Sequence, residues 1–95
     1  MVETKWYVGT TGEKLVVETG QDLSNAMQVS LLIKKPDGTQ EEWVGTANGT
    51  KIEYIVQQGD FDQAGIYKIQ AKATFADGAV WYGNTDVLVI YELFE

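Results

Sequence analysis

Apolar residues recur at every second position along most of this chain, and this period constrains its fold more than any other feature. Residues 67–75 give the clearest example, with Tyr67, Ile69, Ala71, Ala73 and Phe75 alternating with polar side chains. A period of two places successive side chains on opposite faces of a β-strand. Similar runs of strand-forming residues occur at 6–8, 14–18, 27–34, 41–45, 51–57, 79–82 and 87–94. The pattern therefore predicts an all-β chain of seven to eight short strands.

Turn-forming residues separate these runs. Pro36-Asp37-Gly38, Asn48-Gly49 and Asp77-Gly78 supply the residue types that reverse turns and hairpins favour. Only residues 59–64 suggest a turn of helix. Ninety-five residues is the size of one domain. We therefore expect a single domain over residues 1–95 folded as an antiparallel β-sandwich, with a small barrel as the alternative.

Two details favour an immunoglobulin-like (Ig-like) sandwich. Asp62 and Gly65 precede Tyr67 at the start of the clearest strand, an arrangement that resembles the tyrosine corner of that fold. The match is imperfect because Asp62 lies five residues before Tyr67 and the usual spacing is four. Trp43 lies in a central run and is the expected core aromatic. The chain has no Cys, so we expect an Ig-like architecture without the disulfide of true Ig domains.

Three residue types are missing from the chain, namely His, Cys and Arg. The commonest general base near neutral pH, the thiolate nucleophile and the commonest transition-metal ligands are therefore unavailable to it. Glu41 and Glu42 are neighbours, so on a strand they point to opposite faces and cannot form an acid–base pair. We expect no enzymatic activity, no cofactor and no metal. The weaker alternative is a calcium site of loop aspartates, Asp60 and Asp62 with Asp22 or Asp86.

The charge balance and hydropathy limit the partners that the chain can have. Its net charge is −7, and binding to a nucleic acid requires cationic side chains. No stretch approaches the roughly 18 apolar residues of a membrane-spanning helix. The first six residues do not combine a basic segment with an apolar run. We therefore expect neither a nucleic acid nor a membrane as a partner, and synthesis in a cytoplasm.

The last two strand runs carry large apolar residues on both faces. Trp81 and Tyr82 are neighbours, so one of them faces away from the core. Leu88, Ile90 and Phe94 lie on the face of the last run that should be polar, which suggests a covering partner. We expect these five residues to form an interface. Exposed aromatic residues are also common on carbohydrate-binding surfaces, so glycan binding is the alternative.

The chain also contains longer stretches that are similar to a known group of proteins. The most specific are Lys34-Lys35-Pro36-Asp37-Gly38-Thr39 and the nonapeptide Gly-Asp-Phe-Asp-Gln-Ala-Gly-Ile-Tyr at 59–67. Residues 6–9 and 18–23, Trp43 and Tyr54 extend the similarity over nearly the whole chain. Together they resemble the small Ig-like structural proteins of tailed bacteriophages, which occur among tail, baseplate-upper and capsid-accessory proteins. The resemblance implies a β-sandwich in a virion, with no enzymatic activity.

We therefore expect a non-enzymatic virion structural protein, synthesised in the host cytoplasm, that docks in multiple copies on the capsid, neck or tail. Its expected partners are other virion proteins and further copies of itself as a homo-oligomer. The alternative is a glycan-binding module that assists adhesion to the host cell.

Overall fold

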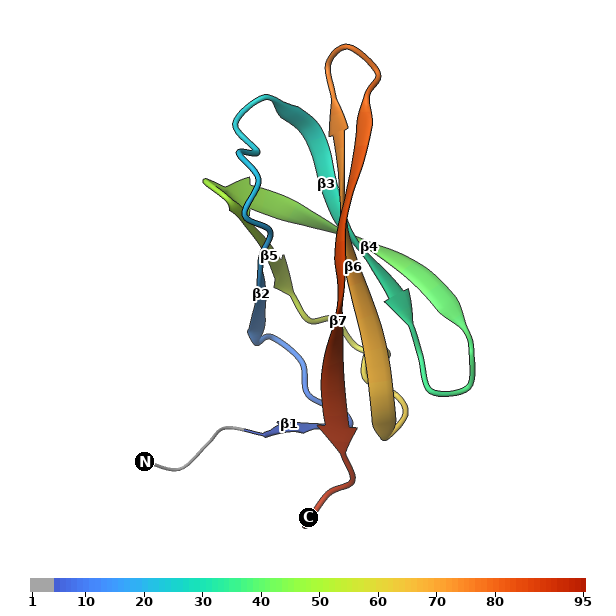
Figure 1. Ribbon diagram of the computed structural model, residues 1–95. Coiled ribbons are helices and arrows are strands. Elements are labelled where there is room, and N and C mark those ends of the chain that lie inside the picture. The colour runs from blue at the N-terminus through green and yellow to red at the C-terminus, as the bar shows by residue number, and fades with distance from the viewer. Residues whose placement is uncertain (1–4) are drawn as a thin grey trace.

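The computed structural model describes residues 5–95, and these residues form seven strands and no helix (Figure 1). The strands are β1 (Trp6–Tyr7), β2 (Lys14–Glu18), β3 (Ala26–Lys34), β4 (Gln40–Asn48), β5 (Lys51–Ile55), β6 (Gly65–Phe75) and β7 (Val80–Tyr91). The prediction of an all-β chain is confirmed. The runs at 79–82 and 87–94 belong to the single long strand β7, and residues 59–64 contain turns but no helix. Residues 1–4 of the predicted domain lie outside the described part.

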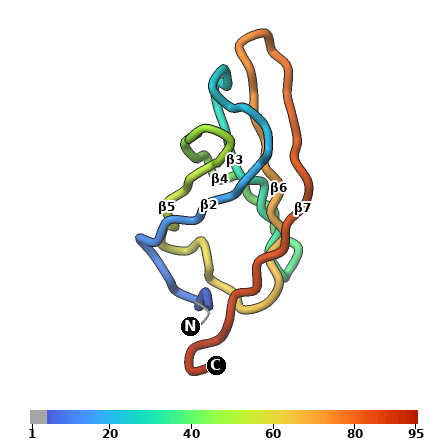
Figure 2. Tube along the Cα trace, turned by 60° about the vertical axis from the view of Figure 1, so that its left-hand side comes forward, coloured from blue at the N-terminus to red at the C-terminus, as the bar shows by residue number. Residues whose placement is uncertain are grey.

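The strands form one mixed, curled sheet in the order β1-β7-β6-β3-β4-β5-β2. Every neighbouring pair is antiparallel except β1 with β7, which is parallel, so the prediction of a wholly antiparallel arrangement is wrong at that edge. The sheet curls into a half-barrel. Figure 2 shows β2 and β5 on one side of the molecule and β6 and β7 on the other.

The curl depends on β4, which pairs with β3 along its first part and with β5 along its last residues, 46–48. Gly45 lies at this change of partner. A Cβ atom added to Gly45 would lie 2.7 Å from the carbonyl oxygen of Glu53 and 2.9 Å from a side-chain methyl of Ile52. The absence of a side chain at Gly45 therefore allows β4 to approach β5 while it leaves β3.

The inner face of the curled sheet encloses an apolar core that is rich in aromatic rings. Trp43 stacks on Tyr54 with their ring centroids 5.0 Å apart, which confirms Trp43 as a core aromatic. Phe61 packs edge-on against Tyr67 and Trp6, both at 5.5 Å. Burying one such side chain stabilises the folded state by about 1.5–3 kcal/mol. The other buried apolar residues are Leu15, Val17, Leu23, Val29, Leu31, Ile33, Ile52, Val56, Ile69, Ala71, Ala73 and Ile90.

Tyr67 fixes the turn that leads into β6. Its buried hydroxyl donates a hydrogen bond to the carbonyl oxygen of Gln63 at 3.0 Å and accepts one from the Gln63 N–H at 3.2 Å. This return of a tyrosine hydroxyl to the backbone a few residues upstream is the contact that defines a tyrosine corner. Burial of the ring raises the pKa of the Tyr67 hydroxyl. The hydroxyl's partner is the backbone of Gln63, four residues before Tyr67, so the contact forms although Asp62 lies five residues before Tyr67.

β7 contains a β-bulge near its middle. Its pairing with β6 shifts register between Gln70 and Lys72, which leaves Gly83 and Asn84 opposite Ala71 alone. The Gln70 side-chain amide donates a hydrogen bond to the Gly83 carbonyl oxygen at 2.9 Å. One extra residue in a strand reverses the facing of every side chain beyond it. The bulge therefore determines which residues of β7 face the core.

Candidate interaction surface

The structure places the predicted interface residues of β7 on both sides of the sheet. Leu88 and Ile90 were expected to face outward, and this prediction is wrong. Ile90 is 1% exposed, and Leu88 lies opposite the core residue Tyr67 and packs against the core. The physical reason is the pairing with β6. Alternation within the run 87–94 separates two faces but does not say which one is inward, and the register places Leu88 opposite the buried Tyr67.

Of the two neighbouring aromatic residues, Tyr82 is the exposed one, at 54%. Trp81 packs against the core, and its indole ring covers Gly83, where an added Cβ would lie 3.0 Å from the ring. The prediction that one of the pair faces away from the core is confirmed. Phe94, the fifth predicted residue, is fully exposed in the segment after β7, and its backbone φ of 73° is uncommon for a residue with a side chain.

Other apolar residues take the outward positions that Leu88 and Ile90 leave. Val87 and Val89 of β7 are 61% and 40% exposed, and Ile66 of β6, directly opposite Val89, is 56% exposed. We call Ile66, Val87 and Val89 the outer strip. Sequence reasoning missed it, because the pattern places Gly83 between two strand runs, whereas in the structure it lies within β7, where a Gly often marks a bulge.

Lysines lie beside the outer strip on the same face of the sheet. Lys68 is directly opposite Val87 on the neighbouring strand, and Lys34 of β3 is directly opposite Lys68. Further along β6, the Lys72 ammonium nitrogen lies 3.7 Å from a carboxylate oxygen of Glu42 of β4. This face is therefore locally basic, although the whole chain has a net charge of −7.

An open groove of about 530 Å³ crosses this basic face next to the outer strip. Its apolar lining residues are Leu32, Ile33 and Ile69, and its charged ones are Lys34, Glu41, Glu42 and Lys68. Glu42 accepts a hydrogen bond from the buried Ser30 hydroxyl at 2.7 Å, which holds its carboxylate on this side of β4. The outer face can thus contact a partner through aliphatic side chains and lysine ammonium groups.

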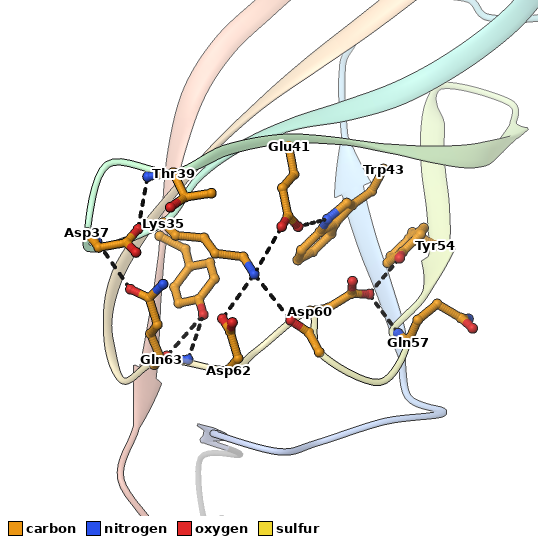
Figure 3. Close-up of polar contacts among 12 residues, drawn as sticks. Lys35, Asp37, Thr39, Glu41, Trp43, Tyr54, Gln57, Asp60, Asp62 and Gln63 are labelled. Carbon is orange, nitrogen blue, oxygen red and sulfur yellow. Dashed lines mark hydrogen bonds and ion pairs between the residues drawn. The ribbon is translucent and has the colours of Figure 1, made fainter.

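A cluster of polar side chains lies at one end of the core, around Lys35 (Figure 3). We call it the polar cluster. The Lys35 ammonium donates hydrogen bonds to Asp62 at 2.9 Å and to the Gly59 carbonyl oxygen at 3.2 Å, and lies 3.3 Å from a Glu41 oxygen. Burial by itself lowers the pKa of Lys35, but the hydrogen bonds to Asp62 and Glu41 outweigh burial and raise it. Glu41 also accepts the Trp43 indole N–H at 2.9 Å.

Asp60 also belongs to this polar cluster. Its carboxylate accepts hydrogen bonds from the Tyr54 hydroxyl at 2.5 Å and from the Gln57 N–H at 2.7 Å. Burial, with the contact to Asp60, raises the pKa of Tyr54. Two of the candidate calcium ligands thus have different partners, since Asp60 accepts a hydrogen bond from Tyr54 and Asp62 accepts one from Lys35. Among residues 5–95, no three acidic, His or Cys side chains gather as a metal site would require.

The hydrogen bonds of the polar cluster hold the turn segment 57–63 in place. Every buried side-chain nitrogen or oxygen in the described part of the chain has a hydrogen-bond partner. The expected opposition of Glu41 and Glu42 is confirmed, because Glu41 reaches Lys35 on the core side and Glu42 reaches Ser30 on the outer face. The two glutamates therefore have different hydrogen-bond and ion-pair partners.

Comparison with known proteins finds no matching family model, no similar curated protein and no similar solved structure. Over residues 5–95, no helix has the length and apolar character needed to span a membrane.

Proposed function

We propose that this chain is a non-enzymatic structural protein of a tailed-bacteriophage virion, which docks in multiple copies on the capsid, neck or tail through protein contacts. The observation that carries the proposal is the outer strip, where aliphatic side chains of two neighbouring strands face solvent together. Contiguous apolar residues on an outward face are typical of interaction sites. The sequence resemblance supplies the virion context.

An Ig-like sandwich is part of this proposal, and the strand connectivity supports it. In an Ig-like domain, strands B, E and D pair in one layer and strands C, F and G in the other. Here β5 pairs with β2 on one side and with the end of β4 on the other, while β6 pairs with β3 and β7. Under this assignment β6 is strand F, and its tyrosine corner at Tyr67 lies near the start of that strand, as in Ig domains.

Docking in many copies suits a chain of this kind. A folded sheet with a filled core loses little conformational freedom when it binds, so a small interface costs less to form. Many copies on one symmetric particle also make individually weak contacts effective. The outer strip can therefore serve as a docking site even though it contains only Ile66, Val87 and Val89.

The glycan-binding alternative depended on exposed aromatic rings as stacking platforms. Trp81 is packed over Gly83, which leaves Tyr82 as the exposed ring of that pair. The outer strip itself is aliphatic and offers no flat ring to a sugar. These observations favour protein docking over glycan binding.

The test is a double variant of the outer strip, Val87→Asp with Val89→Asp. Both side chains face solvent, so we expect the variant to fold, as measured by circular dichroism. We expect mass spectrometry to find the wild-type chain in multiple copies in purified particles of the phage that encodes it, and to find the double variant missing. Leu88 and Ile90 are unsuitable for this test, because a carboxylate buried in the core destabilises the fold.

Val16→Asp is the matched control, since Val16 is an exposed valine of β2, a strand on the other side of the molecule. We expect this variant to enter particles as the wild type does. The proposal is wrong if particles lack the wild-type chain, or if the double variant enters them as well as Val16→Asp does.

A further inference from the structure

The segment that follows β7 is a second exposed apolar feature of the molecule. Residues 92–95 have the sequence Glu-Leu-Phe-Glu, in which Leu93 and Phe94 are 57% and 103% exposed. The Tyr7 hydroxyl donates a hydrogen bond to the Glu95 carbonyl oxygen at 2.8 Å, which holds the segment beside β1. Phe94 is fully exposed, so it does not contact the outer strip of its own molecule.

This segment and the outer face are complementary in both polarity and charge. The segment presents two large apolar side chains between the carboxylates of Glu92 and Glu95. The outer strip presents three aliphatic side chains beside the ammonium groups of Lys68 and Lys34. Apolar surface removed from water supplies affinity, and opposite charges at the rim orient the partners and suppress wrong pairings.

We propose that residues 92–95 of one copy dock on the outer strip of a second copy. Leu93 and Phe94 would cover Ile66, Val87 and Val89, with the glutamates of the segment directed toward Lys34 and Lys68. A second copy is the occupant that the structure supports, because both complementary surfaces belong to this chain. The inference rests on the proposed docking role of the outer strip, and it identifies the partner as the chain itself.

The experiment is sedimentation velocity of the wild-type chain over a range of concentrations. We expect association that grows with concentration and weakens as salt is added, because the rim contacts are ionic. Leu93→Ser with Phe94→Ser, and separately Val87→Thr with Val89→Thr, should each weaken the association by about tenfold or more. Met27→Ser, at an exposed residue of β3, should leave it unchanged.

A charge reversal tests the proposed orientation of the contact. Glu92→Lys with Glu95→Lys should weaken self-association, and so should Lys34→Glu with Lys68→Glu. An equimolar mixture of these two variants should associate more tightly than either alone, because each segment then meets a strip of opposite charge. All the substituted side chains lie at exposed positions, so circular dichroism should report the wild-type fold for each variant.

Three results would overturn the inference: a monomeric wild type at every concentration, segment variants that associate as the wild type does, or a mixture no tighter than its components. The virion role is tested separately, by mass spectrometry of purified particles. A monomeric chain that still requires Val87 and Val89 to enter particles overturns self-association alone. A chain that associates as described but is missing from particles supports the inference and overturns only the virion role.

Discussion

At the scale of single residues, Lys35 is the most unusual feature of the molecule. Its side chain is 3% exposed, although isolated buried charges are strongly destabilising. Its ammonium group connects the end of β3 to the turn segment through Gly59 and Asp62, on either side of the core residue Phe61. Asp62 and Glu41 remain partly exposed, so the two carboxylates keep much of their hydration while they pair with Lys35.

We expect the free energy of unfolding to fall as the pH rises above about 10. The pKa of Lys35 is raised in the folded state from its ordinary value of 10.5. Its stabilising contribution is therefore complete below 10.5 and is lost as the pH rises through the folded-state pKa. The pKa values of Tyr54 and Tyr67 are raised by burial, so the unfolded chain releases these protons first and stability falls in the same direction. Urea unfolding between pH 8 and 11 measures the loss.

Lys35→Met separates the lysine contribution from that of the tyrosines. Met keeps an unbranched stem but loses the charged contacts. We therefore expect the free energy of unfolding at pH 7 to decrease by about 1–3 kcal/mol. The alkaline loss should be smaller in this variant than in the wild type. Lys51→Met, at an exposed position of β5, is the control and should have little effect. If the urea midpoint of the wild type does not change from pH 8 to 11, the predicted loss of stability at alkaline pH is wrong.

At the scale of elements, the strands and turns follow from local sequence, but the facing of strand residues does not. Alternation and Gly-containing turns are local signals, and they identified each strand segment. Strand register and two bulges then decide which residues face the core. Met27 and Val29 are two positions apart in one strand run, so alternation alone would place them on the same face, but Met27 lies at the register shift of β3 and is exposed. In β7, the pairing with β6 beyond the bulge at Gly83 places Leu88 and Ile90 inward and Val87 and Val89 outward.

The candidate surface shows the same limit. Two neighbouring aromatic residues predicted that one of Trp81 and Tyr82 is exposed, but not which one. Phe94 is exposed as predicted, whereas Leu88 and Ile90, predicted from the same alternation, are not. The parallel pairing of β1 with β7 and the placement of Ile66 beside Val89 join segments far apart in the sequence. Alternation within one segment contains no information about such pairings.

Gly45→Ala tests the bend of β4. The new Cβ would meet the Glu53 carbonyl oxygen and the Ile52 side chain at distances that require backbone movement. Overpacking of this kind typically costs about 1–3 kcal/mol, and we expect that loss in urea unfolding. Val44→Ala, at the exposed neighbouring position, should change stability by only about 0.5 kcal/mol. Equal stabilities of the two variants would show that the bend tolerates a side chain.

At the scale of the whole molecule, the two sides of the curled sheet share one strand and one core. β4 pairs with β3 on one side and with β5 on the other, and Trp43 of β4 stacks on Tyr54 of β5. Neither side can therefore lose its structure without exposing the core of the other. The described residues should behave as one cooperative unit.

We accordingly expect a single unfolding transition. Tryptophan fluorescence reports on the core through the buried Trp43 and through Trp6 and Trp81, which pack against the core. Far-ultraviolet circular dichroism reports on the strands. The two signals should give the same urea midpoint, and Gly45→Ala should shift both by the same amount. Distinct midpoints would mean that β2 and β5 unfold separately from the strands on the other side.

The bulge in β7 also has a consequence for how such a chain can evolve. Deleting one codon at Gly83 or Asn84 would exchange the facing of every later residue of the strand, so Leu88 and Ile90 would leave the core together. Substitutions arise one at a time and cannot repair such a change in a single step. We therefore expect descendants of this chain to keep the number of residues between Trp81 and Leu88, while exposed side chains outside the outer strip, such as Asn84 and Thr85, vary. At this place we expect selection to act on spacing as well as on residue identity.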